Sequence, residues 1–441
     1  MWKYIYLLLL NLGELKSQTD EAYLAKPIGN QFSSNIKTYP IVLWWTEKIF
    51  PHFQGDTDVI NCPKGSCVTT TNKKLLTNPR TRGILFYGTD FRAYEAPLPR
   101  MPQHEWALFH EESPMNNYIL SHNTMIRMFN HTATFRRESD FPLTSHPIPS
   151  LQYLTQRKSV PLQEKNVLRQ DGAYAAVLYV QSHCGIASDR DRYITELMKY
   201  IPIDSYGKCL NNKDLPADLQ DTMTMDHPDF LKLISGYKFH LAFENAICDD
   251  YMTEKLFRTL HVGSVPIYRG SAKARDWMPS NKSIIMVDDF KTPEKLANYI
   301  KMLDENDELY SEYLQYKDDG INNEFLINHI SKRTWGINVV GKDDFITGFE
   351  CYVCDRVIER INNQTLPPRI ASYAHMGCPE PDVSYGSRDD VPMSDEWRMW
   401  KEDFWGHMDQ AHALQHMMNI GEKDSSKLFD YLEEMMHNRR Q

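Results

Sequence analysis

The chain has 441 residues, of which 41% are hydrophobic, 24% charged and 12% aromatic, and its formal net charge is −10. This length suits two ordinary domains and a tail, and the balance of apolar and charged residues excludes a chain that is disordered throughout. The acidic total argues against nucleic acid as the main partner, because binding to a phosphate backbone favours a basic face.

The N-terminus is predicted to be a targeting segment. Lys3 precedes a short apolar run that ends near residue 12. Such a run is closer to the core of a signal peptide than to the ~20 residues that span a bilayer. We expect residues 1–14 to form a cleaved signal or a membrane anchor, with a buried strand as the alternative, and residues 15–38 to form a polar stem. The expected location is the lumen of the endoplasmic reticulum or Golgi, where an uncleaved segment would hold the protein to the membrane as type II.

Cysteines and sequons agree with that compartment. The chain has eight cysteines, and an even number in an oxidising lumen favours disulfides. Cys351-x-x-Cys354 could instead bind zinc or carry redox chemistry, but a second Cys-x-x-Cys and a preceding thioredoxin-like strand are missing. The disulfide candidates, with their pairing open, are Cys62, Cys67, Cys351 and Cys354. The candidate N-glycosylation sites are Asn130, Asn281 and Asn363.

Two series of strand signals predict an α/β fold. Apolar runs separated by loops with Pro or Gly predict strands at 41–45, 83–87 and 106–110. After a Pro-containing connection at 142–166, alternating strand and helix signals predict a parallel sheet, with strands at 175–180, 237–243 and 264–268 and helices at 191–200 and 252–261. We therefore expect an N-terminal lobe at 39–160 and a second lobe at 161–345. A tail at 346–441 has the Trp and Met spacing of amphipathic helices that pack.

The densest group of chemically useful residues lies where a predicted strand ends and a helix begins. It runs from Phe243-Glu-Asn245 to Tyr251-Met-Thr-Glu254-Lys255. Ligands bind at this edge of an α/β sheet, and a helix N-terminus offers free N–H groups and a positive dipole end to a diphosphate. Lys255 would add a charge, and Asn245, Tyr251 and Glu254 could bind hydroxyl groups. The alternative for Glu254 and Lys255 is a solvated helix start.

These residues, with Val265-Pro-Ile-Tyr-Arg-Gly270, resemble the donor-binding signature of the α1,3-fucosyltransferases, glycosyltransferase family 10. The segments from Trp106 to Pro114 and from Phe129 to Asp140 resemble the acceptor-side motif of the family, and Ser188-Asp-Arg190 resembles its basic segment. The resemblance runs from about residue 40 to 355. Within the family, the sequence is most similar to a divergent branch that resembles protein O-fucosyltransferases acting in the endoplasmic reticulum on EMI-type domains.

The resemblance implies a fold and a set of roles. The fold is two Rossmann-like lobes (the GT-B architecture) with a mainly helical C-terminal tail; the lobe at 39–160 is on the acceptor side and the lobe at 161–345 binds GDP-fucose. The reaction inverts the anomeric centre in one displacement. The base of the family falls on Glu112; Glu111 beside it should face the other way on an extended strand. Arg190 and Lys255 match diphosphate ligands, whereas the nucleotide and sugar contacts match Asn245, Tyr251 and Glu254. No metal or other cofactor is implied.

The sequence therefore predicts transfer of fucose from GDP-fucose to a glycoprotein, at a Ser or Thr hydroxyl of a folded extracellular module, possibly of the EMI type. The alternatives are α1,3-fucosylation of GlcNAc on N-glycans and, from another class, a catalytically silent luminal binding protein. Asp189-Arg-Asp191 could be an Asp-x-Asp manganese motif, but Arg190 has the better claim to that position. The doublet Asp249-Asp250 is interpreted as a helix cap.

Overall fold

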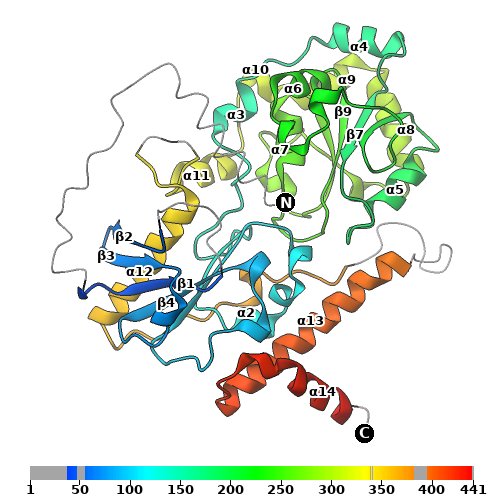
Figure 1. Cartoon of the computed structure of the whole chain (residues 1–441). Coiled ribbons are helices and arrows are strands. Elements are labelled where there is room, and N and C mark those ends of the chain that lie inside the picture. Colours follow the sequence, from blue (N-terminus) through cyan, green and yellow to red (C-terminus); the bar gives the residue numbers. More distant parts are fainter. Residues whose placement is uncertain (1–36, 47–54, 338, 340, 382–394, 440–441) are drawn as a thin grey trace.

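The computed structural model describes residues 37–46, 55–337, 339, 341–381 and 395–439, which form two α/β lobes followed by tail helices (Figure 1). The predicted signal or anchor at 1–14, and the stem at 15–38 up to residue 36, lie outside the described residues. Among the described residues, no helix has both the length and the apolar character needed to cross a membrane.

The first lobe is built on a six-stranded sheet of order β2-β3-β1-β4-β5-β6. β2 runs antiparallel to β3, and the other neighbours are parallel. Its strands are β1 (Ile41–Trp44), β2 (Thr57–Cys62), β3 (Gly65–Thr70), β4 (Thr81–Tyr87), β5 (Glu105–His110) and β6 (His131–Thr134). Every residue of β5 is buried, which is the pattern of a parallel strand covered on both faces. The predicted strands at 41–45, 83–87 and 106–110 are confirmed.

The second lobe holds a five-stranded parallel sheet of order β11-β10-β9-β7-β8. Its strands are β7 (Val177–Gln181), β8 (Ile203–Gly207), β9 (Phe239–Phe243), β10 (Val265–Arg269) and β11 (Ile285–Met286). The helices from 151 to 332 are α3 (Leu151–Thr155), α4 (Leu162–Gln170), α5 (Arg190–Leu197), α6 (Pro228–Ser235), α7 (Glu254–His261), α8 (Pro293–Asp304), α9 (Asp307–Ser311), α10 (Tyr316–Asp319) and α11 (Glu324–Lys332). α3 contacts α7, and Ile148 and Leu154 share a core with it. The connection at 142–166 therefore already contributes to the second lobe.

The tail returns to the first lobe. α12 (Phe345–Asn362) lies across the first sheet and contacts β1 to β5 (Figure 1). Two disulfides, Cys62–Cys351 and Cys67–Cys354, join it to the hairpin of β2 and β3. The four candidate cysteines thus pair between the two motifs and not within them. Glu350 of α12 is 1% exposed and accepts hydrogen bonds from Trp44 Nε1 at 2.6 Å and Thr69 Oγ1 at 2.7 Å.

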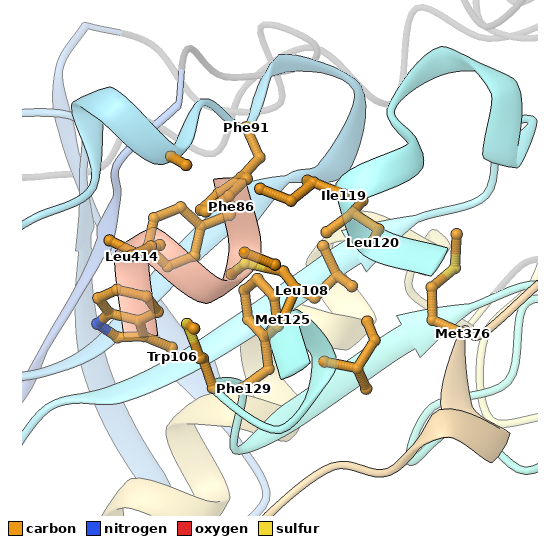
Figure 2. Packing of buried hydrophobic residues seen from close by; sticks show 14 of the residues in the cluster. Phe86, Phe91, Trp106, Leu108, Ile119, Leu120, Met125, Phe129, Met376 and Leu414 are labelled. Atoms are coloured by element: carbon orange, nitrogen blue, oxygen red, sulfur yellow. The ribbon is translucent and has the colours of Figure 1, made fainter. Parts of the chain in front are cut away.

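The last helices complete the core on the other face of the sheet. α13 (Asp395–Ile420) and α14 (Leu428–Arg439) form a hairpin, and α13 also contacts α2 (Asn123–Ile126). Figure 2 shows Leu414 of α13 beside Phe86 and Trp106, and Met376 of the preceding segment on the far side of the same core cluster. At its beginning, α13 reaches the second lobe, where Trp397 Nε1 donates to the carbonyl of Ala187 at 3.2 Å. Trp397 and Met417 of this helix are buried, as their spacing predicts, whereas Met399 and Trp405 are 61% and 46% exposed.

Candidate active site

The end of β5 presents a pair of adjacent carboxylates. Glu111 is 3% exposed, and neither of its oxygens has a hydrogen-bond partner among the described residues, whereas Glu112 is only half-buried. Burial and then the charge of Glu112 raise the pKa of Glu111 to about 8. Of the two, Glu112 is therefore the one that solvent and a substrate can reach, as expected for side chains that alternate along an extended strand. Ser113 follows and accepts a hydrogen bond from the backbone N–H of Met115 at 3.3 Å.

The second lobe contributes the loop from β9 to α7. Thr253 is the N-cap of α7, so the helix begins at Glu254 and Lys255. Glu244 at the end of β9 is fully buried and accepts hydrogen bonds from the backbone N–H and the hydroxyl of Thr253, both at 2.8 Å. Burial raises the pKa of Glu244 to about 7 against the opposing effect of Lys255. A cavity of about 50 Å³ lies between α7 and its neighbours β7, α6 and β9, with Lys255 and Arg258 among its lining residues.

Charges from the two lobes meet at this loop. Lys255 Nζ lies 3.1 Å from Glu254 Oε1 and 4.0 Å from Glu244 Oε2. Burial opposes ionisation of Glu254, but Lys255 and Arg258 outweigh it and lower its pKa to about 2. The pKa of Glu112 is raised by burial and then by Glu254, and Lys255 acts against both. The structure thus brings Glu112 of one lobe within electrostatic reach of Glu254 and Lys255 of the other.

Tyr251 and Asn245 belong to the same loop. Tyr251 is 3% exposed, and its pKa is raised by burial and by Glu244 and Glu112. Its ring packs edge-on against Phe135 of the first lobe, with centroids 5.2 Å apart. The side-chain oxygen of Asn245 is buried and has no hydrogen-bond partner among the described residues.

Arg190 is 1% exposed at the start of α5. Its Nη1 and Nη2 donate to the backbone carbonyls of Phe243 and His183, each at 2.9 Å. Arg190 therefore holds the loop before α5 against the end of β9, and its contact with a diphosphate stays a prediction. The flanking acidic residues also have partners, because Asp189 pairs with Arg192 at 2.6 Å and Asp191 accepts the N–H of Gly185 at 2.9 Å.

The loop is fastened to the first lobe at four successive residues. Cys248 forms a disulfide with Cys378, Asp249 lies 3.9 Å from Arg136, Asp250 pairs with Arg137, and Tyr251 packs on Phe135. The Asp250 pair is buried and bidentate: Arg137 Nε lies 2.8 Å from Oδ2, and Nη2 lies 2.6 Å from Oδ1. The interpretation of Asp249-Asp250 as a helix cap is wrong, since Thr253 caps α7. The sequence offered a signal for this contact in the complementary doublets Arg136-Arg137 and Asp249-Asp250.

The sequon asparagines differ in exposure. Asn281 and Asn363 are exposed, as a glycan requires. Asn130 is 6% exposed, its Nδ2 donates to the carbonyl of Arg369 at 2.7 Å, and its Oδ1 accepts from the N–H of Trp106 at 2.8 Å. The folded chain has no room for a glycan at Asn130, and this site does not fit the prediction.

Comparisons with known proteins give the relationships of the chain. The family description "Fucosyltransferase, N-terminal" matches residues 37–145, and "Glycosyltransferase family 10 (fucosyltransferase) C-term" matches residues 172–372. GDP-fucose protein O-fucosyltransferase 3 of Xenopus laevis is 46% identical over 386 residues, which are 86% of this chain and 81% of that protein. The Homo sapiens protein of the same name is 44% identical over 402 residues, covering 89% of this chain and 82% of that one. A crystal structure of an α1,3-fucosyltransferase with GDP-fucose is 15% identical, with a TM-score of 0.40 and coverage of 74% and 91%.

Proposed function

We propose that this chain transfers L-fucose from GDP-fucose to a hydroxyl group of a protein acceptor, because it belongs to glycosyltransferase family 10, the fucosyltransferases. The observation that carries this proposal is that Glu112 of the first lobe lies within electrostatic range of Glu254 and Lys255, with which α7 of the second lobe begins. The names of the two relatives, both called protein O-fucosyltransferases, support a protein acceptor.

In the proposed reaction the acceptor oxygen attacks the anomeric carbon of fucose from the side opposite to GDP. Glu112 takes the hydroxyl proton as the new C–O bond forms, and the bond to GDP breaks with its electron pair leaving on the diphosphate. A base placed in this way contributes about 10²–10⁴-fold to the rate. The raised pKa of Glu112 brings it nearer to neutral pH and makes it a stronger base than an ordinary glutamate.

The donor end of the site would stabilise the leaving group. Lys255 and the positive end of the α7 dipole offer positive charge to the departing diphosphate without rearrangement. Glu254, whose low pKa keeps it ionised, would accept hydrogen bonds from the sugar or ribose and favour positive charge on the sugar ring. The side-chain oxygen of Asn245, which has no partner among the described residues, would accept a further hydrogen bond from a hydroxyl group of the sugar or ribose. These charges belong to the protein, and we propose that the reaction needs no metal or other cofactor.

The chemical identity of the acceptor hydroxyl and the location of the enzyme in the cell are also part of the proposal. We infer a Ser or Thr hydroxyl of a folded extracellular module, with the EMI type as the first candidate, from the resemblance of the sequence to that branch. The lumen of the endoplasmic reticulum or Golgi is supported by the four disulfides, since disulfides persist in oxidising compartments. Attachment to the membrane would depend on residues 1–14.

The test is to incubate the purified protein with GDP-fucose and a secreted EMI-type domain, and to map the added mass by peptide mass spectrometry. We expect a deoxyhexose on Ser or Thr and release of one GDP per sugar transferred. A deoxyhexose confined to the N-glycan would overturn the hydroxyl acceptor but keep the fucosyltransferase. Absence of GDP release with any acceptor would favour the silent binding protein.

A further inference from the structure

A second cavity lies in the first lobe, at the other end of β5 from Glu112. Its volume is about 180 Å³, and it is lined by Arg82, Gln103, Glu105, Val357, Arg360, Ile361 and Gln364. Arg82 and Glu105 stand at the beginnings of β4 and β5, and the last residues come from the end of α12 and the turn after it. β5 has six residues, so about 20 Å of strand separates this cavity from the reaction site.

The negative charge in the cavity is already compensated. Glu105 is 2% exposed, and its two oxygens are bonded to His131 Nε2 and Arg360 Nη1. These partners outweigh the effect of burial and lower the pKa of Glu105. Glu105 therefore keeps its charge at neutral pH and accepts a hydrogen bond from Nη1 of Arg360.

The positive charge of Arg82 is uncompensated. This half-buried guanidinium has no ion-pair or hydrogen-bond partner in the part of the chain that the structure describes, and the same is true of the side-chain amides of Gln103 and Gln364. Nε of Arg360 is likewise buried without a partner among those residues. The neighbouring His104 has its pKa lowered to about 4, first by burial and then by Arg100 and Arg82. The cavity thus offers a net positive charge and several unused N–H donors.

These features fit a carboxylate. A guanidinium binds a carboxylate through two parallel hydrogen bonds, and side-chain amides can donate further ones. The volume equals about six water molecules at ~30 Å³ each, enough for the end of an acidic side chain. Val357 and Ile361 supply an apolar wall for its methylene groups, and exposed Ile361 and Gln364 leave the mouth open to a protein surface.

We propose that this cavity docks an Asp or Glu side chain of the protein acceptor and that Arg82 is its main ligand. The inference rests on the proposed transfer to a protein. Glu112 and the cavity lie in the same lobe, and their separation of about 20 Å is within the ~30 Å diameter of a small domain. One acceptor domain can therefore place its hydroxyl at Glu112 and its carboxylate at Arg82.

The experiment measures the KM for the acceptor domain with wild type, Arg82→Gln, Arg82→Glu and Arg127→Gln. Arg127 is an exposed arginine of the same lobe and serves as the matched control. All four proteins carry Asn363→Gln, because a glycan there would stand beside Gln364 at the mouth. We expect Arg82→Gln to raise the acceptor KM at least tenfold and Arg82→Glu to raise it further, with kcat and the KM for GDP-fucose within twofold of wild type. An acceptor KM that is unchanged in both Arg82 variants overturns the proposal.

The partner carboxylate is identified from the acceptor side. Surface Asp and Glu residues of the acceptor are changed one at a time to Asn and Gln, and one change should raise the KM of wild type but not that of Arg82→Gln. Fully additive effects at every acidic position would overturn the acceptor carboxylate and leave a free anion as the ligand. If wild type transfers no fucose, the proposed function fails, and the same variants are then compared by the Kd of the acceptor domain in surface plasmon resonance.

Discussion

The ion pair between Arg137 and Asp250 should be the contact between the lobes whose loss costs most. Asp250 is fully buried, and Arg137 donates to it from Nε and Nη2, while Trp277 Nε1 adds one hydrogen bond at 3.1 Å. Arg137→Met would leave a buried carboxylate without its counter-charge, at a cost of about 3–5 kcal/mol. Since each kcal/mol lowers Tm by about 2–4 °C in a domain of 150–250 residues, we expect Tm to fall by roughly 10 °C.

The assay is a double-mutant cycle in chemical and thermal unfolding with Arg137→Met, Asp250→Asn and the double variant. Removing both charges should cost less than the sum of the single losses, by about 1–3 kcal/mol. Arg275→Met is the control, since Arg275 and its partner Asp289 are 48% and 55% exposed and such pairs contribute about 0–1 kcal/mol. Additive single effects, or a loss no larger than that of Arg275→Met, would refute the reasoning.

The pH dependence of this pair has a definite sign. Arg137 overcomes the effect of burial and lowers the pKa of Asp250 in the folded chain. Its stabilisation is therefore complete above about pH 4, the ordinary pKa of Asp, and is lost as the pH falls toward the lowered value. The difference in stability between wild type and Arg137→Met should shrink as the pH falls, because protonation of Asp250 removes the buried charge that the variant leaves unpaired.

Three further outcomes are expected. In Glu254→Gln, the acid limb of the pH profile of kcat/KM should move to lower pH, because the charge that helps to raise the pKa of Glu112 is removed. An acid limb that does not move would show that Glu254 does not influence the pKa of Glu112. Transfer activity should survive EDTA, and loss that manganese restores would contradict the metal-independent mechanism. In secreted protein, Asn281→Gln and Asn363→Gln should each increase the electrophoretic mobility by the shift expected for the loss of one glycan. A glycan found at Asn130 would contradict the burial of that side chain.

Local pattern predicted much of the fold. The five residues of β9 are all buried, as the apolar run predicts, and α7 begins where Thr253, Glu254 and Lys255 give a helix start. The loop between them was identified as a donor site because strand end, polar residues and helix N-terminus follow one another directly in the sequence. The hairpin of β2 and β3 was missed, since its partly exposed β2 lacks the apolar run that marks the other strands.

Contacts between distant segments could not be predicted. Nothing local shows that Cys351 joins Cys62 across 289 residues, so the return of α12 to the first sheet stayed hidden. Arg137 and Asp250 are 113 residues apart, and their pairing depends on how the lobes dock. Asn130 looked like a glycosylation site because the triplet carries no information about burial. Arg190 was assigned to a ligand by residue type, whereas its burial against two carbonyls appears only in the fold.

The most direct test of the account is a comparison of Glu112→Gln with Glu111→Gln in transfer of fucose to the secreted acceptor domain. Both changes replace one carboxylate by its neutral isostere at neighbouring positions, and only Glu112 is exposed enough to reach a substrate. We predict that Glu112→Gln lowers kcat by about 10²–10⁴-fold, while Glu111→Gln keeps kcat within a few-fold of wild type. Equal losses in both variants, or a larger loss in Glu111→Gln, would contradict the assignment of Glu112 as the base.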